Sequence, residues 1–241
     1  MIPNTINISP PGWDSFTAYG IGGLAIIIAV YWMLLFSFRN LRQFLIMATL
    51  MITIMGISSY VAFAGILSSF DNFPPPMMIM IIALPIMAFV FSFSKFGQDG
   101  ISKISLYTLL GLQSFRLPLE IIMHEASNKN IMPDELSFSG YNFDIITGLT
   151  ALIIFIFYQF GFTISKRILW AWNIWGSLCL LAIFIIAITT SPIVRLFGDD
   201  PRHLNTWVLY FPYVWLPVVL VTIAISSHII IWRKLLTNKL N

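Results

Sequence analysis

Long apolar stretches separated by short polar connections dominate the pattern of hydrophobic and polar positions along the chain. A helix that crosses a membrane needs about 20 mostly apolar residues. Seven stretches read as such spans, at about residues 17–38, 43–68, 77–93, 104–126, 143–164, 169–190 and 212–232. The pattern therefore predicts an all-α fold, a polytopic seven-helix transmembrane bundle that forms one domain over residues 1–241.

The connection between the sixth and seventh spans carries its own helix signal. Asp199 and Asp200 precede Pro201, and an acidic cap followed by proline is typical of a helix start. We expect a short helix at about residues 201–210, lying at the outer membrane interface.

Composition agrees with a membrane protein. Hydrophobic residues make up 58% of the chain and charged residues 10%, and the mean hydropathy is +0.87. A soluble domain of this size has too little interior to hide so much apolar surface. The N-terminus lacks a basic region, so we expect no cleaved signal peptide. The basic residues are few and lie at span ends, which argues against nucleic acid as a partner.

The distribution of Lys and Arg predicts the orientation. Connections on the cytoplasmic side of membrane proteins carry an excess of these residues. One side of the predicted bundle has nine of them, namely Arg39, Arg42, Lys95, Lys103, Lys166, Arg167, Arg233, Lys234 and Lys239. The other side has Lys129, Arg195 and Arg202. We therefore expect the N-terminus outside and the C-terminus in the cytoplasm.

The fourth span contains a polar stripe. Gln113, Arg116, Glu120 and His124 follow one another at spacings of three, four and four, which places them on one face of a helix. Ionisable groups at membrane depth are costly unless they pair or line a wet cavity. The stripe should therefore face protein or water. Pro118 cannot donate a hydrogen bond to the carbonyl four residues earlier, which predicts a bend at this point.

Other polar residues could meet this stripe on the outer side. The fifth span begins with Asn142 and Asp144, and the outer connection contributes Tyr210. With Arg116, Glu120 and His124, these residues predict a pocket in the outer half that binds or transports a small ligand. Arg116 would be the deep cation, with Glu120 as its partner, and it could meet an anionic group. Glu120 or His124 could exchange protons.

Two other interpretations remain open. Glu120 and His124 are four residues apart and could share a metal ion, with Asp144 and His203 completing the site of a membrane-embedded metal-dependent hydrolase. Alternatively, the stripe only fixes helix packing in a partner subunit of a membrane complex or in a homo-oligomer, and Asp144 only caps its helix. His228 in the last span is predicted to be a hydrogen-bonded packing histidine.

Three segments together resemble a group of uncharacterised bacterial multi-span membrane proteins. They are residues 115–120 through His124, the segment from Gly140 to Gly148, and residues 209–212 through Pro217. The resemblance covers spans four to seven. It implies a location in the bacterial cytoplasmic (inner) membrane and implies no activity.

Overall fold

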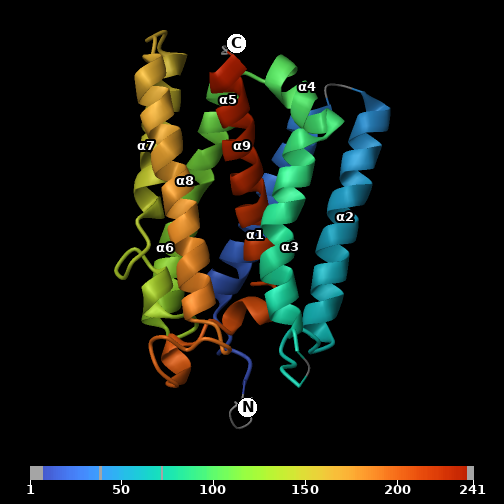
Figure 1. Cartoon of the computed structure of the whole chain (residues 1–241), viewed down its shortest axis with the longest axis vertical. Coiled ribbons are helices and arrows are strands. Elements are labelled where there is room, and N and C mark those ends of the chain that lie inside the picture. The colour runs from blue at the N-terminus through green and yellow to red at the C-terminus, as the bar shows by residue number, and fades with distance from the viewer. Residues whose placement is uncertain (1–7, 38–39, 72, 238–241) are drawn as a thin grey trace.

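The computed structural model describes residues 8–37, 40–71 and 73–237, and this part of the chain is helical and contains no strand (Figure 1). The all-α prediction is therefore confirmed for these residues. Five helical segments are long and apolar enough to cross a membrane. They are α1 (Ser15–Ser37), α2 (Leu41–Phe63), α3 (Pro76–Phe93), α8 (Lys166–Thr189), and the segment Leu216–Thr237, in which the π-helical turn η5 (Leu216–Val221) leads into α9 (Thr222–Thr237).

The fourth and fifth predicted spans take a less regular form. The fourth consists of α5 (Leu106–Leu112), the 3-10 segment η1 (Gln113–Phe115) and α6 (Arg116–Asn128). The interruption lies where Pro118 leaves the carbonyl of Ser114 without its helical donor, as the sequence predicts. The fifth predicted span is α7 (Asp144–Gln159), which has 16 residues.

Two connections differ from the expectation. Residues 95–103, which lie in the short polar connection between the third and fourth predicted spans, form the helix α4 (Lys95–Lys103), which buries Gly97, Gly100 and Ile101. The helix expected at 201–210 is replaced by two 3-10 turns, η3 (Pro201–His203) and η4 (Trp207–Leu209). The Asp200 side chain caps η3 as predicted. The helix expected at 201–210 ends after η3 because the backbone N–H of Asn205 donates to the carbonyl of Thr190, at 2.8 Å, and not to a carbonyl within the connection.

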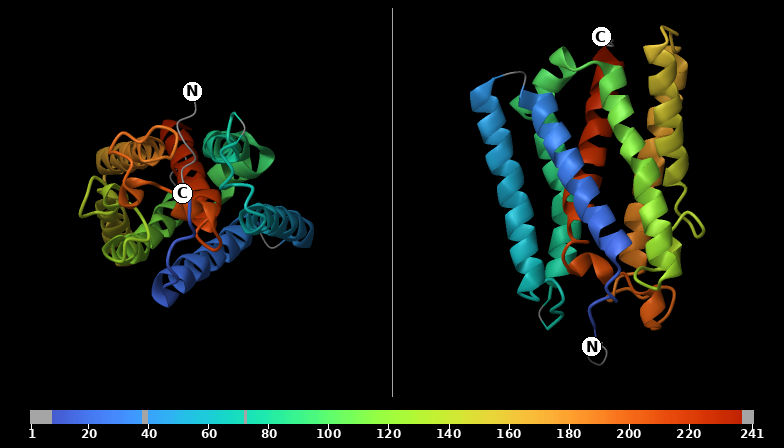
Figure 2. Two further views of the ribbon diagram at one scale, coloured as in Figure 1. Left: turned by 90° about the horizontal axis from the view of Figure 1, so that it is seen from below. Right: turned by 180° about the vertical axis from the view of Figure 1, so that it is seen from behind.

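The helices form one bundle with two distinct ends (Figures 1 and 2). The lower end in Figure 1 holds the start of α1, the 3-10 turn η2 (Asp134–Leu136), η3 and η4; the upper end holds α4 and the last turn of α9. The α9 helix packs against α3, α8, α5 and α4, and α6 packs between α1 and α7. The path α5–η1–α6 descends from the upper to the lower end, and a loop leads from there to α7, which begins partway up the bundle and reaches the upper end.

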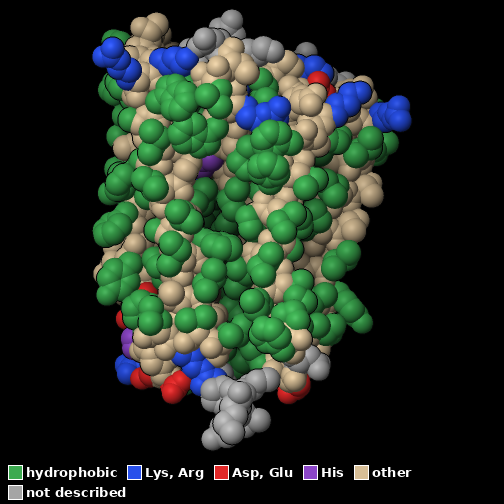
Figure 3. Space-filling view, in the orientation of Figure 1, with side chains coloured by type: hydrophobic (Ala, Val, Ile, Leu, Met, Phe, Trp, Pro, Cys, Tyr) green, Lys and Arg blue, Asp and Glu red, His purple; other side chains and the backbone are tan. Residues whose placement is uncertain are grey.

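Charged side chains gather at the two ends (Figure 3). Lys and Arg line the upper end in this view, and both acidic and basic side chains lie at the lower end. Arg39 and Lys239, which contribute to the predicted orientation, lie outside the described residues. The broad band between the two ends is apolar on the face shown, which is the surface that lipid chains require.

Candidate functional site

A buried ion pair joins α6 to α7. The Nη1 atom of Arg116 donates to Oδ1 of Asp144 at 2.9 Å, and the two side chains are 1% and 4% exposed. The partner of Arg116 is thus Asp144, and not Glu120 as the i, i+4 spacing suggested. The helices come close enough for this because Gly148 presses against α6: a Cβ at Gly148 would lie 2.5 Å from the backbone nitrogen of Leu117.

Asn142 connects the second carboxyl group, that of Glu120, to the start of α7. Its Nδ2 atom lies 2.9 Å from both carboxylate oxygens of Glu120 and 3.0 Å from the carbonyl oxygen of Leu136. Its Oδ1 atom accepts the backbone N–H of Asp144 at 3.0 Å. The side chain that accepts a backbone N–H at the start of α7 is therefore that of Asn142, while the Asp144 carboxylate pairs with Arg116. We call Arg116, Glu120, Asn142 and Asp144 the charged network.

The charged network contains two carboxyl groups and one guanidinium. In the described part of the chain, no Lys, Arg or His nitrogen forms an ion pair with Glu120, although this residue is only 1% exposed. The Nη2 atom of Arg116 is buried and has no hydrogen-bond partner among the described residues. Arg116, Glu120 and Asp144 line a cavity of about 20 Å³, which is large enough for about one water molecule.

The remaining predicted pocket residues do not join the network. His124 is partly exposed; its Nδ1 atom lies 3.1 Å from the Ser137 hydroxyl, and its ring stacks on Phe138 at 4.3 Å. The Tyr210 hydroxyl donates to the carbonyl of Ile8 at 3.2 Å. The predicted pocket is therefore reduced to the four residues of the charged network and is nearly filled.

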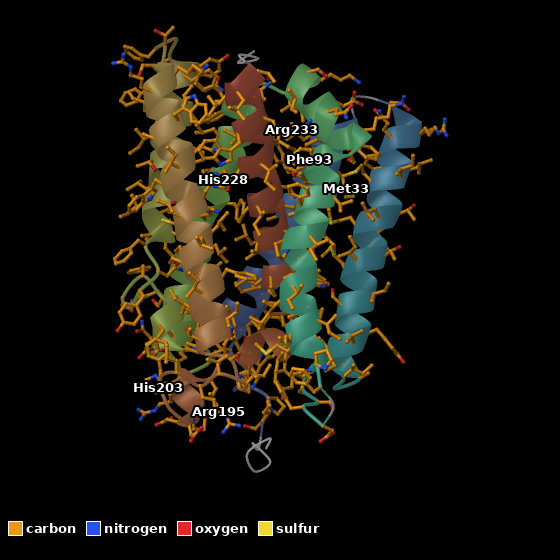
Figure 4. All side chains as sticks on the ribbon, viewed as in Figure 1. Met33, Phe93, Arg195, His203, His228 and Arg233 are labelled. Atoms are coloured by element: carbon orange, nitrogen blue, oxygen red, sulfur yellow. The ribbon has the colours of Figure 1, made fainter. Side chains whose placement is uncertain are left out.

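The predicted metal site is not assembled. Among the described residues, no group of three or more His, Cys, Asp or Glu side chains is placed to hold a metal ion. His203 instead bonds through Nδ1 to Oε1 of Glu135 at 2.6 Å, and it lies at the lower end of the bundle (Figure 4). Glu120 and Asp144 are engaged by Asn142 and Arg116. The four candidate metal ligands are thus engaged in different contacts.

A second polar cluster lies higher in the bundle, between α8 and α9 (Figure 4). The Nδ1 atom of His228 lies 2.7 Å from Oδ1 of Asn173, whose Nδ2 atom donates to the carbonyl of His228 at 3.3 Å. His228 is 2% exposed, which confirms the prediction of a hydrogen-bonded packing histidine. Its partner was not predicted, although Asn173 and Gly176 stand out in an otherwise apolar part of α8.

The fold and these contacts define a multi-pass helical membrane protein with a buried charged network between two helices. The chain belongs to a family described as a domain of unknown function, DUF8737, whose model matches residues 73–236. This range runs from before α3 into the last turn of α9, so the matched part of the chain contains the four residues of the charged network and leaves α1 and α2 outside. No curated protein and no solved structure matches the chain.

Proposed function

We propose that this chain is a seven-span membrane protein of the binding or transport type, and that its charged network binds a proton at Glu120. In this proposal the lower end of the bundle faces outward, the upper end faces the cytoplasm, and the membrane is the bacterial cytoplasmic membrane. The observation that carries the proposal is that Glu120 is buried in the bundle and forms no ion pair with a Lys, Arg or His nitrogen of the described residues.

The charge count of the network supports a proton at Glu120. An uncompensated charge in a bundle interior costs several kcal/mol, roughly, because neither lipid nor packed side chains replace its hydration. Arg116 compensates one carboxylate, and its contact at 2.9 Å goes to Asp144. The amide of Asn142 gives Glu120 a hydrogen bond but no positive charge. A proton on Glu120 neutralises the network.

Competition for Arg116 would couple the proton to helix packing. Loss of the proton from Glu120 creates a second carboxylate that attracts the same guanidinium, and the Nη2 atom of Arg116 is available to it. A shift of Arg116 from Asp144 toward Glu120 would weaken the link between α6 and α7. A small anionic ligand could reach Arg116 only with such a loosening, because the present cavity of about 20 Å³ admits about one water molecule.

The seven-span topology adds the path α5–η1–α6 and the helix α7 to the five longer segments. The path α5–η1–α6 runs between the two ends of the bundle, and α7 runs from partway up the bundle to the upper end in Figures 1 and 2. The basic side chains at the upper end in Figure 3 favour this end as the cytoplasmic one. The short α7 is flanked by α5, α6 and α8, and neighbouring helices help a short span to be accommodated in a bilayer.

A second candidate is a structural subunit in which the network only fixes helix packing. The small size of the cavity favours it, as does the pairing of Arg116 with Asp144. In this case Glu120 would stay in one protonation state and nothing would pass through the bundle.

Proton flux into vesicles distinguishes the two candidates. The purified chain is reconstituted into lipid vesicles loaded with a pH-sensitive dye, and the internal pH is followed after an external pH step. We expect the wild type to equilibrate faster than Glu120→Gln. The matched control is Glu125→Gln, on the same helix, because Glu125 is partly exposed and pairs with Lys129 at 3.0 Å. Equal rates for wild type, both variants and empty vesicles would favour the structural subunit.

A further inference from the structure

An ion pair joins the two short turns η2 and η3 at the lower end of the bundle. The Nδ1 atom of His203 in η3 lies 2.6 Å from Oε1 of Glu135 in η2. The side chain of His203, which Figure 4 shows at this end, is 37% exposed, and that of Glu135 is 8% exposed. The pair therefore connects a histidine that solvent can protonate to a carboxyl group that lies inside the fold.

The buried carboxyl group of Glu135 depends on the charge of His203. Its second oxygen, Oε2, is buried and has no hydrogen-bond partner among the described residues. In the same part of the chain, no Lys or Arg nitrogen forms an ion pair with Glu135. A buried carboxylate is costly unless it is paired, and a hydrogen bond from a charged donor is stronger than one from a neutral donor. The pair is therefore strong while His203 is protonated and weakens when its imidazole becomes neutral.

The charged groups around the pair have contacts of their own. Asp200 and Arg202, beside His203 in the connection, bond to each other at 2.8 Å. The side chain of Asp134 in η2 accepts a hydrogen bond from Ser127 of α6. The last turn of α8, which also packs against η2, has no charged side chain. These contacts leave His203 to compensate the carboxylate of Glu135.

The η2 turn belongs to a closed loop, residues 134–142, that returns to the charged network. The backbone N–H of Tyr141 donates to the carbonyl of Glu135 at 3.2 Å. The backbone N–H of Asn142 donates to the carbonyl of Ser137, also at 3.2 Å. A movement of Glu135 is therefore transmitted to residues 141 and 142 through the backbone.

Asn142 extends this coupling to the proton site. Its Nδ2 atom lies 3.0 Å from the carbonyl oxygen of Leu136, the residue after Glu135. The same Nδ2 atom lies 2.9 Å from both carboxylate oxygens of Glu120. Successive contacts thus lead from the exposed imidazole of His203 through η2 and Asn142 to Glu120.

We propose that His203 and Glu135 are positioning residues for the proton site at Glu120, and that their ion pair is a latch controlled by the outside pH. Protonated His203 holds η2 in place, and with it the contact of Asn142 to Glu120. As the outside pH rises, the neutral imidazole releases Glu135, the loop 134–142 loosens, and Glu120 becomes accessible to outside water. The regulation rests on the proposed proton binding at Glu120, whereas the latch itself does not.

Cysteine labelling of the purified full chain in detergent tests the latch. The chain has one cysteine, Cys179, which is replaced by alanine in every variant. The reporter is Leu136→Cys, because Leu136 is 4% exposed and lies beside Glu135. The reference is Tyr141→Cys, because Tyr141 is 57% exposed in the same loop. The rate of reaction with a maleimide is measured for each cysteine, and the ratio of the reporter rate to the reference rate removes the effect of pH on thiol reactivity.

We expect this ratio to rise several-fold from about pH 5.5 to about pH 9, which spans the range where histidines usually change charge. His203→Phe should give a high ratio at both pH values, and His203→Arg, which keeps a positive charge, should give a low ratio at both. The matched control is His124→Phe, because His124 contacts the same loop through Ser137. Its ratio should rise as in the wild type.

The latch is refuted if the wild-type ratio does not change with pH, if His203→Phe changes as the wild type does, or if His124→Phe abolishes the change. Glu120→Gln separates the latch from the proton site, because its ion pair between η2 and η3 is intact and its ratio should still rise with pH.

Proton flux into vesicles tests the regulation. At an outside pH of about 6, His203→Phe should equilibrate several-fold faster than His203→Arg. Equal rates for these two variants, together with a wild type that is faster than Glu120→Gln, would overturn the regulation and leave the proton site in place. Equal rates for the wild type and Glu120→Gln would overturn the proton site and the regulation with it, while the labelling ratio would still report on the latch.

Discussion

Two buried polar clusters, one between α6 and α7 and one between α8 and α9, are built on the same plan. In the first, Arg116 of α6 meets Asp144 of α7, and Gly148 lets the two helices touch. In the second, His228 of α9 meets Asn173 of α8. There, Gly176 makes room for the imidazole, because a Cβ at this position would lie 2.4 Å from Cε1 of His228.

The two clusters differ in which of their polar groups have no hydrogen-bond or ion-pair partner among the described residues. In the cluster between α8 and α9, the imidazole of His228 bonds to the amide oxygen of Asn173, and the amide nitrogen of Asn173 donates to the backbone carbonyl of His228. The Nε2 atom of His228 has no hydrogen-bond partner among the described residues. In the cluster between α6 and α7, the carboxyl group of Glu120 forms no ion pair with any described residue. Burial alone therefore does not mark a functional group in this bundle. A charge that the fold does not balance is the more specific sign.

The largest expected effects come from the two glycines. At Gly148 the obstacle to a Cβ is the backbone of α6 at Leu117, 2.5 Å away, so Gly148→Ala should force α6 and α7 apart and prevent stable folding. At Gly176 the obstacle is a side chain. Gly176→Ala should therefore lower the melting temperature strongly, and adding His228→Ala should restore part of the loss. Thermal melting followed by size-exclusion chromatography measures both.

Gly56→Ala is the control for the glycine series. Gly56 lies in α2, and nothing within 4 Å would meet its Cβ, so this substitution should leave the melting temperature unchanged or raise it slightly, since alanine favours helix over glycine. A mild effect of Gly148→Ala, similar to that of Gly56→Ala, would contradict the close contact between α6 and α7.

Removal of the charge of Asp144 should have the next largest effect. Asp144→Asn keeps the shape but removes the carboxylate that pairs with Arg116, and removing one partner of a buried ion pair costs about 3–5 kcal/mol. Glu120→Gln removes no partner of Arg116 and should change the free energy of unfolding far less. Denaturant or thermal unfolding of the purified variants provides the comparison. If Glu120→Gln were as destabilising as Asp144→Asn, Glu120 would be the true partner of Arg116.

The smallest effect is expected at the surface. Lys129 lies 2.7 Å from Asp14, and its hydrogen bond, with that of the Thr17 backbone, lowers the pKa of the Asp14 carboxyl. A carboxyl group whose pKa is lowered in the folded state stabilises the fold at pH values above the ordinary pKa of aspartate. This contribution is lost as the pH falls through the lowered pKa. Asp14→Asn should therefore lower the melting temperature slightly at neutral pH and low salt, and not at strongly acidic pH.

The sequence predicted the parts of the fold that follow from local pattern. Apolar length identified α1, α2, α3 and α8, and the cost of charge in lipid correctly predicted burial for Arg116 and Glu120. The spacing rule failed for the partner of Arg116. Neighbours on one helix are visible in sequence, but the approach of α7 depends on a contact at Gly148 that only packing establishes.

The connection between α8 and η5 was the least predictable part. Asp200 and Pro201 gave a correct cap signal, but the long-range bond from Asn205 to Thr190 ended the helix after one turn. An apolar groove between α3 and α8, lined by Ile81 and Ile183, was not predicted at all, because its walls come from helices about 100 residues apart along the chain. Apolar side chains that line a groove look the same in sequence as those that face lipid.

Infrared difference spectroscopy tests the central claim most directly, because the C=O stretch of a protonated carboxyl group in an apolar site is separated from that of ionised carboxylates. A pH titration of the reconstituted protein should show one such band that disappears as the pH rises. The band should be absent in Glu120→Gln and unchanged in Glu125→Gln. A band that persists in Glu120→Gln, or a wild type without any protonated carboxyl band, would contradict proton binding at Glu120.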